Sequence, residues 1–317
     1  MNLRSSSSRQ TIVGTCLEKC AAAVQEIGAG RWSFVLSNGT LVPAVAQADE
    51  DWLIVEAPVA DWKRDDRSRP SAWTWLGLNA RLEGVTKIAR LPDDDSLRVR
   101  ADIALDDDVD LVARLREACA GLVLASESIG EGGGHVSEHG GTREAAASTI
   151  DLASLCRDAG WTFAEREGGR VAVDLGIRGG PGQALIEQHA DGAVRASVAL
   201  ASCDDVTPSS GDALGVFLLT ACGIVRLARA AVQEEEAARV PRFEVRYAAP
   251  PVSAEIGHAL SALSVACALF GREAQALRDD RVARTYLSMR GKRPEGRRSS
   301  RHSRRAATSA AATAVGD

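Results

Sequence analysis

A glycine-rich stretch near the middle of the chain constrains its architecture most. The sequence SIGEGGGHVSEHGGTREAAAS, residues 128–148, has almost no large apolar side chain. This composition is typical of a flexible tether, and 317 residues suffice for about two domains. We therefore expect five parts: a disordered N-terminus (1–10), a first domain (11–127), a linker (128–147), a second domain (148–290) and a disordered basic tail (291–317).

The first half alternates between helical and strand patterns. Apolar residues at helical spacing predict a helix over residues 11–27. Trp32, Phe34 and Leu36 then alternate as on a strand, and Asn38-Gly39 is a strong signal for a hairpin turn. The pattern continues with a strand over 51–59, a helix over 72–82, two strands near 85–90 and 97–105, and a closing helix after the aspartates at 106–110.

The stretch WLGLNARLEGVTKIAR, residues 75–90, contains an asparagine and several cations among apolar residues. An active site is one interpretation, but no histidine or carboxylate cluster stands beside it. The favoured interpretation is a joint between a helix and a strand. It places Lys87 and Arg90 on a solvated face of the sheet, and Asn79 on the helix surface or in a local hydrogen bond.

The second half repeats the theme. Trp161 and Phe163 correspond to Trp32 and Phe34, with a Gly-Gly turn at 168–169, which suggests a duplication. Four strands are expected before a long helix around Leu214–Val225, and a single strand, RFEVRYA, after it. Two helices follow, over residues 253–270 and 272–287. The predicted fold class is α+β, with two related domains that each consist of an antiparallel sheet flanked by helices.

This order of elements resembles the type III secretion chaperones and the YbjN-like peptide-binding domains, in tandem. The segments that carry the resemblance are GRWSFVLSNGTLVPAV, WLGLNARLEGVTKIARL, LRVRADIAL and LVARLREACAGL, with GWTFAEREGGRVAVDL and IGHALSALSVACALFGREAQAL in the second copy. It covers about 270 residues as a match of order and pattern, without an invariant motif. The resemblance implies a non-enzymatic binder of extended or partly folded protein segments that uses no cofactor.

The leading functional prediction is therefore a cytoplasmic chaperone or adaptor that binds a partner protein. Tryptophan is enriched at binding hot spots, and Trp52, Trp62 and Trp73 are the predicted partner-binding residues. The alternative is that these rings pack within their own domain. Because the halves are related, they could pair within one chain as an intramolecular pseudo-dimer, or the chain could form a homodimer.

Charge is unevenly distributed along the chain. Residues 291–317 carry seven Lys or Arg against Glu295 and Asp317, a net charge of +5. Because the whole chain has a net charge of −5, the other residues together carry −10. An acidic body is unsuited to general nucleic-acid binding, which needs clustered cations. The arginine-rich tail nevertheless supports an alternative function, a regulatory protein that associates with nucleic acid through this tail.

Other candidates for chemistry are weak. Cys16, Cys20, Cys119, Cys156, Cys222 and Cys267 fall on apolar helix faces, as reduced core thiols of a cytoplasmic protein do. His135 and His139 lie in the linker, where no fixed backbone would hold a metal. The longest apolar run, residues 213–225, is too short to span a bilayer. We expect no catalytic residues, no metal site and no membrane association.

Overall fold

The computed structural model describes residues 6–37, 41–59, 71–130, 149–179, 181–200, 206–235 and 238–291. Within them the chain forms two antiparallel six-stranded sheets flanked by helices, which confirms the predicted α+β class. The elements of the first half are α1 (Ser6–Glu18), β1 (Ala22–Gly28), β2 (Arg31–Ser37), β3 (Leu41–Asp49), β4 (Trp52–Pro58), α2 (Ala72–Arg81), β5 (Thr86–Arg90), β6 (Leu97–Ala104) and α3 (Leu111–Gly130). Those of the second half are α4 (Leu152–Asp158), β7 (Phe163–Arg166), β8 (Arg170–Asp174), β9 (Gln183–Gln188), β10 (Val194–Ala199), α5 (Pro208–Ile224), β11 (Arg229–Glu235), β12 (Ala238–Tyr247), α6 (Ser253–Ala276) and α7 (Asp280–Gly291).

The two halves share one topology in the described residues. Each begins with a helix and four strands, continues with a helix and two strands, and closes with a helix. The strand orders correspond too: β1-β2-β3-β4-β6-β5 in the first sheet and β7-β8-β9-β10-β12-β11 in the second. This identity of order is what a duplication would produce, and only α7 has no counterpart in the described first half.

One strand of the second half was missing from the sequence prediction. Two strands follow α5, not one, because residues 229–235 form β11 and pair with β12. The segment RAAVQEE is rich in residues that favour helices. Its strand conformation depends on pairing with the next strand, β12, and on burial of Ala230 and Ala231, where α2 of the first half packs against β11.

The predicted helix over residues 11–27 was right over residues 11–18 and wrong beyond them. Helix α1 begins at Ser6, inside the segment expected to be disordered, and ends at Glu18. Residues 22–28 instead form β1 and pair with β2, with register shifts on both sides of Gln25 and Glu26. The spacing of Val24 and Ile27 fits a helical stripe, and pairing with β2 overrode that local signal.

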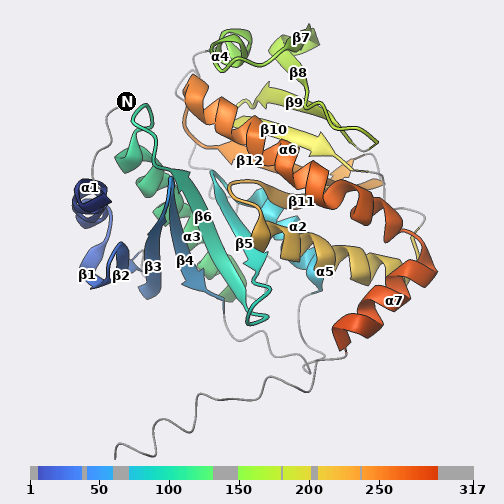
Figure 1. The fold of residues 1–317 in the computed structure, drawn as a ribbon, viewed down its shortest axis with the longest axis horizontal. Helices are drawn as coiled ribbons and strands as arrows, with labels where there is room; N and C mark the ends of the chain where they lie inside the picture. Colours follow the sequence, from blue (N-terminus) through green and yellow to red (C-terminus); the bar gives the residue numbers. More distant parts are fainter. Residues whose placement is uncertain are drawn as a thin grey trace, which may run out of the picture.

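Helices cover the sheets in a crossed arrangement, which Figure 1 shows. Helices α1 and α3 lie against the first sheet, and α4 and α6 against the second. By contrast, α2 of the first half packs against β11 of the second, and α5 of the second half packs against β5 of the first. Each half therefore packs one of its helices against the sheet of the other half, as in an isologous interface between two subunits.

The inner edges of the two sheets, β5 and β11, face each other at the centre of the molecule (Figure 1). Buried backbone groups at such edges need hydrogen-bond partners. Asn79 supplies them for both strands: its side chain accepts from Ile88 N–H at 2.6 Å and donates to the carbonyls of Ile88 and Ala230 at 3.1 and 2.9 Å. Cys222 Sγ accepts from Ala230 N–H at 3.0 Å. Asn79 is therefore a fully buried bridge between the halves, and its predicted place on the helix surface was wrong.

Two helix glycines should respond in opposite directions to alanine. A methyl group on Gly223 of α5 would lie 2.4 Å from the carbonyl oxygen of Arg90. This oxygen is a backbone atom, so no side-chain rotation can relieve the clash. We expect Gly223→Ala to lower the free energy of unfolding by about 1–3 kcal/mol. Gly77 of α2 has nothing within 4 Å of an added methyl, so Gly77→Ala should raise it by about 0.5–1 kcal/mol. Urea unfolding of both variants tests the pair, and equal effects would contradict the close approach of α5 and β5.

Candidate partner-binding groove

The cations of the stretch 75–90 are buried, not solvated as the sequence pattern predicted. Lys87 and Asp102 are both 0% exposed and lie 2.7 Å apart. Lys87 Nζ also donates to the carbonyls of Val225 and Ala228, on the loop that leads from α5 to β11. Arg100 donates to Asp102 at 2.8 Å. The tertiary reason is that the second half covers this side of β5 and β6, so the whole set holds the two halves together.

A corresponding set lies on the other side of the centre. Arg229 of β11 pairs with Glu244 of β12 at 2.9 Å, and both side chains are 2% exposed. Its guanidinium also donates to the carbonyls of Leu82, Gly84 and Thr86, on the loop that leads from α2 to β5. Lys87 and Arg229 therefore make reciprocal contacts. Each reaches from its own strand to the helix-to-strand loop of the opposite half.

Arg90, the other cation predicted on a solvated face, is also nearly buried and pairs with Asp95. Burial, followed by the neighbouring charge of Arg290 in α7, lowers its pKa. A third buried cluster joins α3 to α6, where Arg114 donates to Glu255 at 2.8 Å and also pairs with Glu117. These charges lie where elements meet, and those of the stretch 75–90 make it a structural joint between the two halves of the chain.

Stability should fall in acid because of Asp102. Burial alone would raise its pKa, but the charges of Lys87 and Arg100 outweigh burial and lower it to about 2. An unfolded Asp titrates near 3.9, so between these values the unfolded chain binds more protons and stability rises with pH. We expect a loss of about 2 kcal/mol from this group as the pH falls from 5 to 2. Urea unfolding across this range measures it, and Asp102→Asn should show a shallower decline. An equal slope in both proteins would contradict the assignment.

The three predicted tryptophans have different surroundings. Trp52, half-buried on β4, lies with its ring centroid 5.8 Å from that of His258 on α6, so it packs at the junction of the halves. Trp62 lies outside the described residues. Trp73 is half-buried near the start of α2, beside α5, where Gly211 and Gly215 leave room for its indole. Of the two that the structure describes, Trp73 lines an open groove and Trp52 does not.

This groove, which we call the Trp73 groove, runs between α2 and the second sheet and has a volume of about 670 Å³. Helix α2 forms one wall, with Ser71 as its N-cap accepting from Thr74 N–H at 3.2 Å. Strands β10, β11 and β12 form the other. Its lining residues are Ser71, Trp73, Thr74, Gly77, Ala80, Arg81, Arg195, Val232, Gln233, Arg239 and Arg246. The sequence pointed to Trp73 but not to the arginines, which are up to 173 residues away along the chain.

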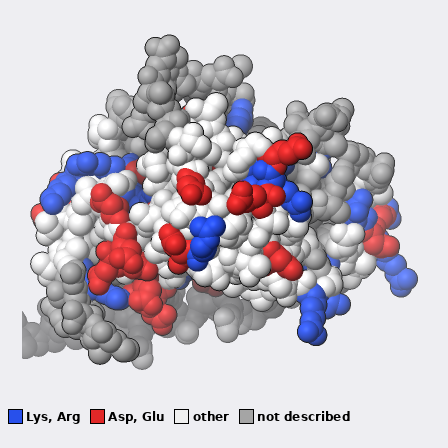
Figure 2. Space-filling model, turned by 90° about the horizontal axis from the view of Figure 1, so that it is seen from above, with Lys and Arg blue, Asp and Glu red and all other residues white. Residues whose placement is uncertain are grey.

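The groove is strongly basic. Four arginines line it, and none of the described lining residues is a carboxylate. Arg195 pairs with Glu187 at 3.1 Å and Arg246 with Asp191 at 2.9 Å, which holds both guanidiniums in place. Arg81 and Arg239 are exposed. Elsewhere the charges are mixed: seen from above, acidic and basic side chains intersperse, with acidic ones gathered toward the first half (Figure 2). The four arginines of the groove are a local concentration of positive charge that suits an anionic partner.

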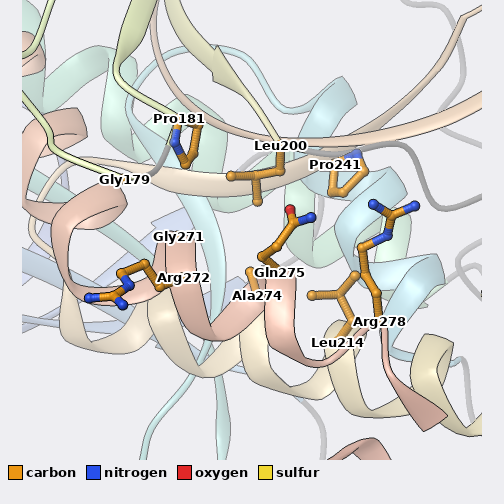
Figure 3. A pocket seen from close by; sticks show the side chains of 10 residues that line it. All are labelled: Gly179, Pro181, Leu200, Leu214, Pro241, Gly271, Arg272, Ala274, Gln275 and Arg278. Atoms are coloured by element: carbon orange, nitrogen blue, oxygen red, sulfur yellow. The ribbon is translucent and has the colours of Figure 1, made fainter.

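A second cavity of about 360 Å³ lies between α6, α5 and the ends of the second sheet. In Figure 3, Gln275 near the end of α6 and Arg278 just after that helix point toward Leu200 and Pro241, and Arg272 points away from the centre. Residue 180 and residues 201–205, which adjoin Pro181 and Leu200 in the chain, lie outside the described residues. We assign this cavity no ligand.

The cysteines predicted as core thiols are free, and all but Cys20 are buried. Cys20 lies just after α1, not on the helix face predicted for it. Burial raises the pKa of Cys119 and Cys267 to about 12 and that of Cys156 to about 11. These thiols are protonated at neutral pH, and a protonated thiol is a poor nucleophile. Among the described residues, no group of three or more His, Cys, Asp or Glu could hold a metal ion.

Several predictions concern residues that the structure does not describe. Residues 128–130 of the predicted linker belong to α3, and residue 291 of the predicted tail belongs to α7. The remaining linker residues, 131–147, with His135 and His139, lie outside the described residues, as do residue 148, the Asn38-Gly39 turn, residues 1–5 and the tail from residue 292. Within the described part, α6 is the one helix long and apolar enough to cross a membrane by length and composition, and half of that stretch is buried in the fold. The predicted cytoplasmic location stays a prediction.

Comparison with known proteins gives no relative for this chain. No protein family model, no curated protein and no solved structure matches it.

Proposed function

We propose that this chain is a non-catalytic protein-binding module, a chaperone or adaptor that holds a segment of a partner protein in the Trp73 groove. The observation that carries the proposal is the groove itself, in which a half-buried tryptophan stands among four arginines. Tryptophan and arginine are the residues most enriched at binding hot spots. A groove of about 670 Å³ between a helix and a sheet is large enough to receive several side chains of a partner.

The resemblance to secretion chaperones and YbjN-like domains supports a binder of protein segments, and a sheet edge is one place where such a segment can add. In this chain the inner edges β5 and β11 are buried against each other, so neither is open to a partner strand. Among the described strands the outer edges are β1 and β7. Strand β1 is interrupted by register shifts, and β7 has only four residues. Short or bulged edges discourage strand addition, which favours the groove over the sheet edges as the binding surface.

A pull-down with the full-length protein from its native cell extract tests this function. The wild type should recover one or two proteins in stoichiometric amounts, and Trp73→Ala should reduce their recovery about tenfold. Trp161→Ala is the matched control, because Trp161 is also half-buried against the core but lies outside the groove. Circular dichroism checks that both variants remain folded. Equal recovery by Trp73→Ala and wild type would contradict the proposal.

The same experiment separates the alternative function. A nucleic-acid-associated protein that used its arginine-rich tail would retain nucleic acid in a salt-dependent manner. Deletion of residues 292–317 would abolish that retention and leave the groove unchanged. Recovery of nucleic acid without a stoichiometric protein would therefore favour the tail.

A further inference from the structure

Helix α7 offers an internal precedent for what the Trp73 groove binds. It follows α6 and packs on the outer face of α5. Tyr286 of α7 meets Phe217 of α5 edge to face, with ring centroids 6.0 Å apart. Arg290 of α7 donates to Thr220 Oγ1 at 3.1 Å. Near these contacts, Arg90 of β5 lies close enough to Tyr286 and Arg290 for their charges to interact.

The duplicated topology identifies the counterparts of these residues in the other half. Helices α2 and α5 align on their C-cap residues Leu82 and Val225, which have nearly the same backbone angles. Strands β5 and β11 align on Lys87 and Arg229, the two cations with reciprocal contacts. The helix alignment makes Cys222 the counterpart of Asn79. Asn79 Nδ2 and Cys222 Sγ lie 3.9 Å apart where the halves meet.

Three positions that contact or adjoin α7 then have counterparts in the Trp73 groove. Under this alignment Phe217 corresponds to Thr74, Thr220 to Gly77 and Arg90 to Val232. Thr74, Gly77 and Val232 all line the groove. The surface that α7 covers on α5 and β5 thus corresponds to the surface of α2 and β11 that lines the groove.

We propose that the Trp73 groove is the docking position for an acidic amphipathic helix of a partner protein, placed on α2 as α7 is placed on α5. This inference rests on the proposed function and names the partner's chemistry. The length of α7 is twelve residues, so about three turns of helix fill such a position. One apolar or aromatic side chain takes the place of Tyr286 beside Trp73 and Thr74. Glutamates or aspartates on the flanks meet Arg81, Arg239 and their neighbours.

The composition of the groove favours this occupant over others. Trp73, Val232, Ala80 and the bare backbone of Gly77 give an apolar floor suited to a helix face. Nucleic acid presents a continuous row of phosphates, whereas this groove combines its apolar floor with arginines, two of which pair with Glu187 and Asp191. The chain's own tail, residues 292–317, is strongly basic and would be repelled by the arginines.

The test uses the full-length protein and a labelled probe peptide of twelve residues, stapled because an isolated helix of this length is marginal in water. The probe carries Leu and Tyr on one face and Glu on the other. One control peptide replaces each Glu with Lys, and another keeps the composition but breaks the apolar face. Fluorescence anisotropy measures binding. We expect binding of the first peptide only, weakened about tenfold by Arg81→Glu with Arg239→Glu. Arg166→Glu, an exposed arginine on β7 outside the groove, should leave it unchanged.

Gly77→Glu provides a second variant that should not harm folding, because a side chain at Gly77 meets open space. It should weaken the probe about tenfold by placing a like charge in the groove.

Several results would overturn the inference. Equal binding of the scrambled peptide would show that charge alone acts, without a helix face. Displacement of the probe by a single-stranded oligonucleotide at similar concentration would assign the groove to nucleic acid. Binding that appears only after deletion of residues 131–148 would assign it to the chain's own linker. If no peptide binds while the pull-down partner is still lost with Trp73→Ala, the proposed function survives and the helical occupant does not.

Discussion

Replacing Asp102 with Ala should lower the free energy of unfolding by about 3–5 kcal/mol. The carboxylate accepts from Arg100 Nε at 2.8 Å and from Leu227 N–H at 2.9 Å, and pairs with Lys87 at 2.7 Å. Its removal leaves the fully buried Lys87 ammonium with carbonyl partners only. Removing one partner of a buried pair is much more costly than removing both, because the remaining charge loses its compensation.

Urea unfolding of three proteins measures this effect: wild type, Asp102→Ala, and Lys87→Met combined with Asp102→Leu. The double variant should be more stable than the single one, since apolar side chains replace both Lys87 and Asp102, and Arg100 keeps its pair with Glu56 at 3.4 Å. A single variant within about 1 kcal/mol of wild type would instead be the behaviour of an exposed ion pair. It would contradict the burial of this pair between the halves.

Arg229→Met should be comparably destabilising, by about 3–5 kcal/mol. The change leaves the buried Glu244 without its cation and removes three hydrogen bonds to the carbonyls of Leu82, Gly84 and Thr86. Because those carbonyls belong to the first half, the loss should loosen the contact between the halves. Hydrogen exchange should therefore accelerate at the amides of β5 and at the end of α2, in addition to the lower stability seen in urea.

Arg9→Met is the matched control for Arg229→Met. Arg9 also pairs with a carboxylate, Asp51 at 3.0 Å, but both side chains are largely exposed. Exposed pairs contribute at most about 1 kcal/mol, so Arg9→Met should change neither stability nor exchange at β5 appreciably. If both variants behaved alike, burial of Arg229 would not be what makes it important.

The candidate site was accessible from sequence only in part. Trp73 could be selected because a tryptophan in a charged segment is a reasonable hot-spot candidate. Arg195, Arg239 and Arg246 could not, because the chain is rich in arginine and nothing local distinguishes those three. They become a set only when β10 and β12 bring them opposite α2.

Local pattern determined most of the elements and the fold class. Alternation and turn residues identified the β2–β3 and β7–β8 hairpins, and helical spacing identified α2, α3, α5 and α6, because these signals act within a few residues. Tertiary structure decided the conformation of segments whose local signals compete. It also decided the burial of residues that another part of the chain covers. Val24 and Ile27 became part of a strand through pairing with β2, and RAAVQEE through pairing with β12. Lys87 and Arg90 were predicted to be solvated because cations on a strand usually face water. The packing of α5, α7 and the loop from α5 to β11 buries them. Burial of a charged side chain depends on which residues of the other half pack against it. A short stretch of sequence contains no information on that packing.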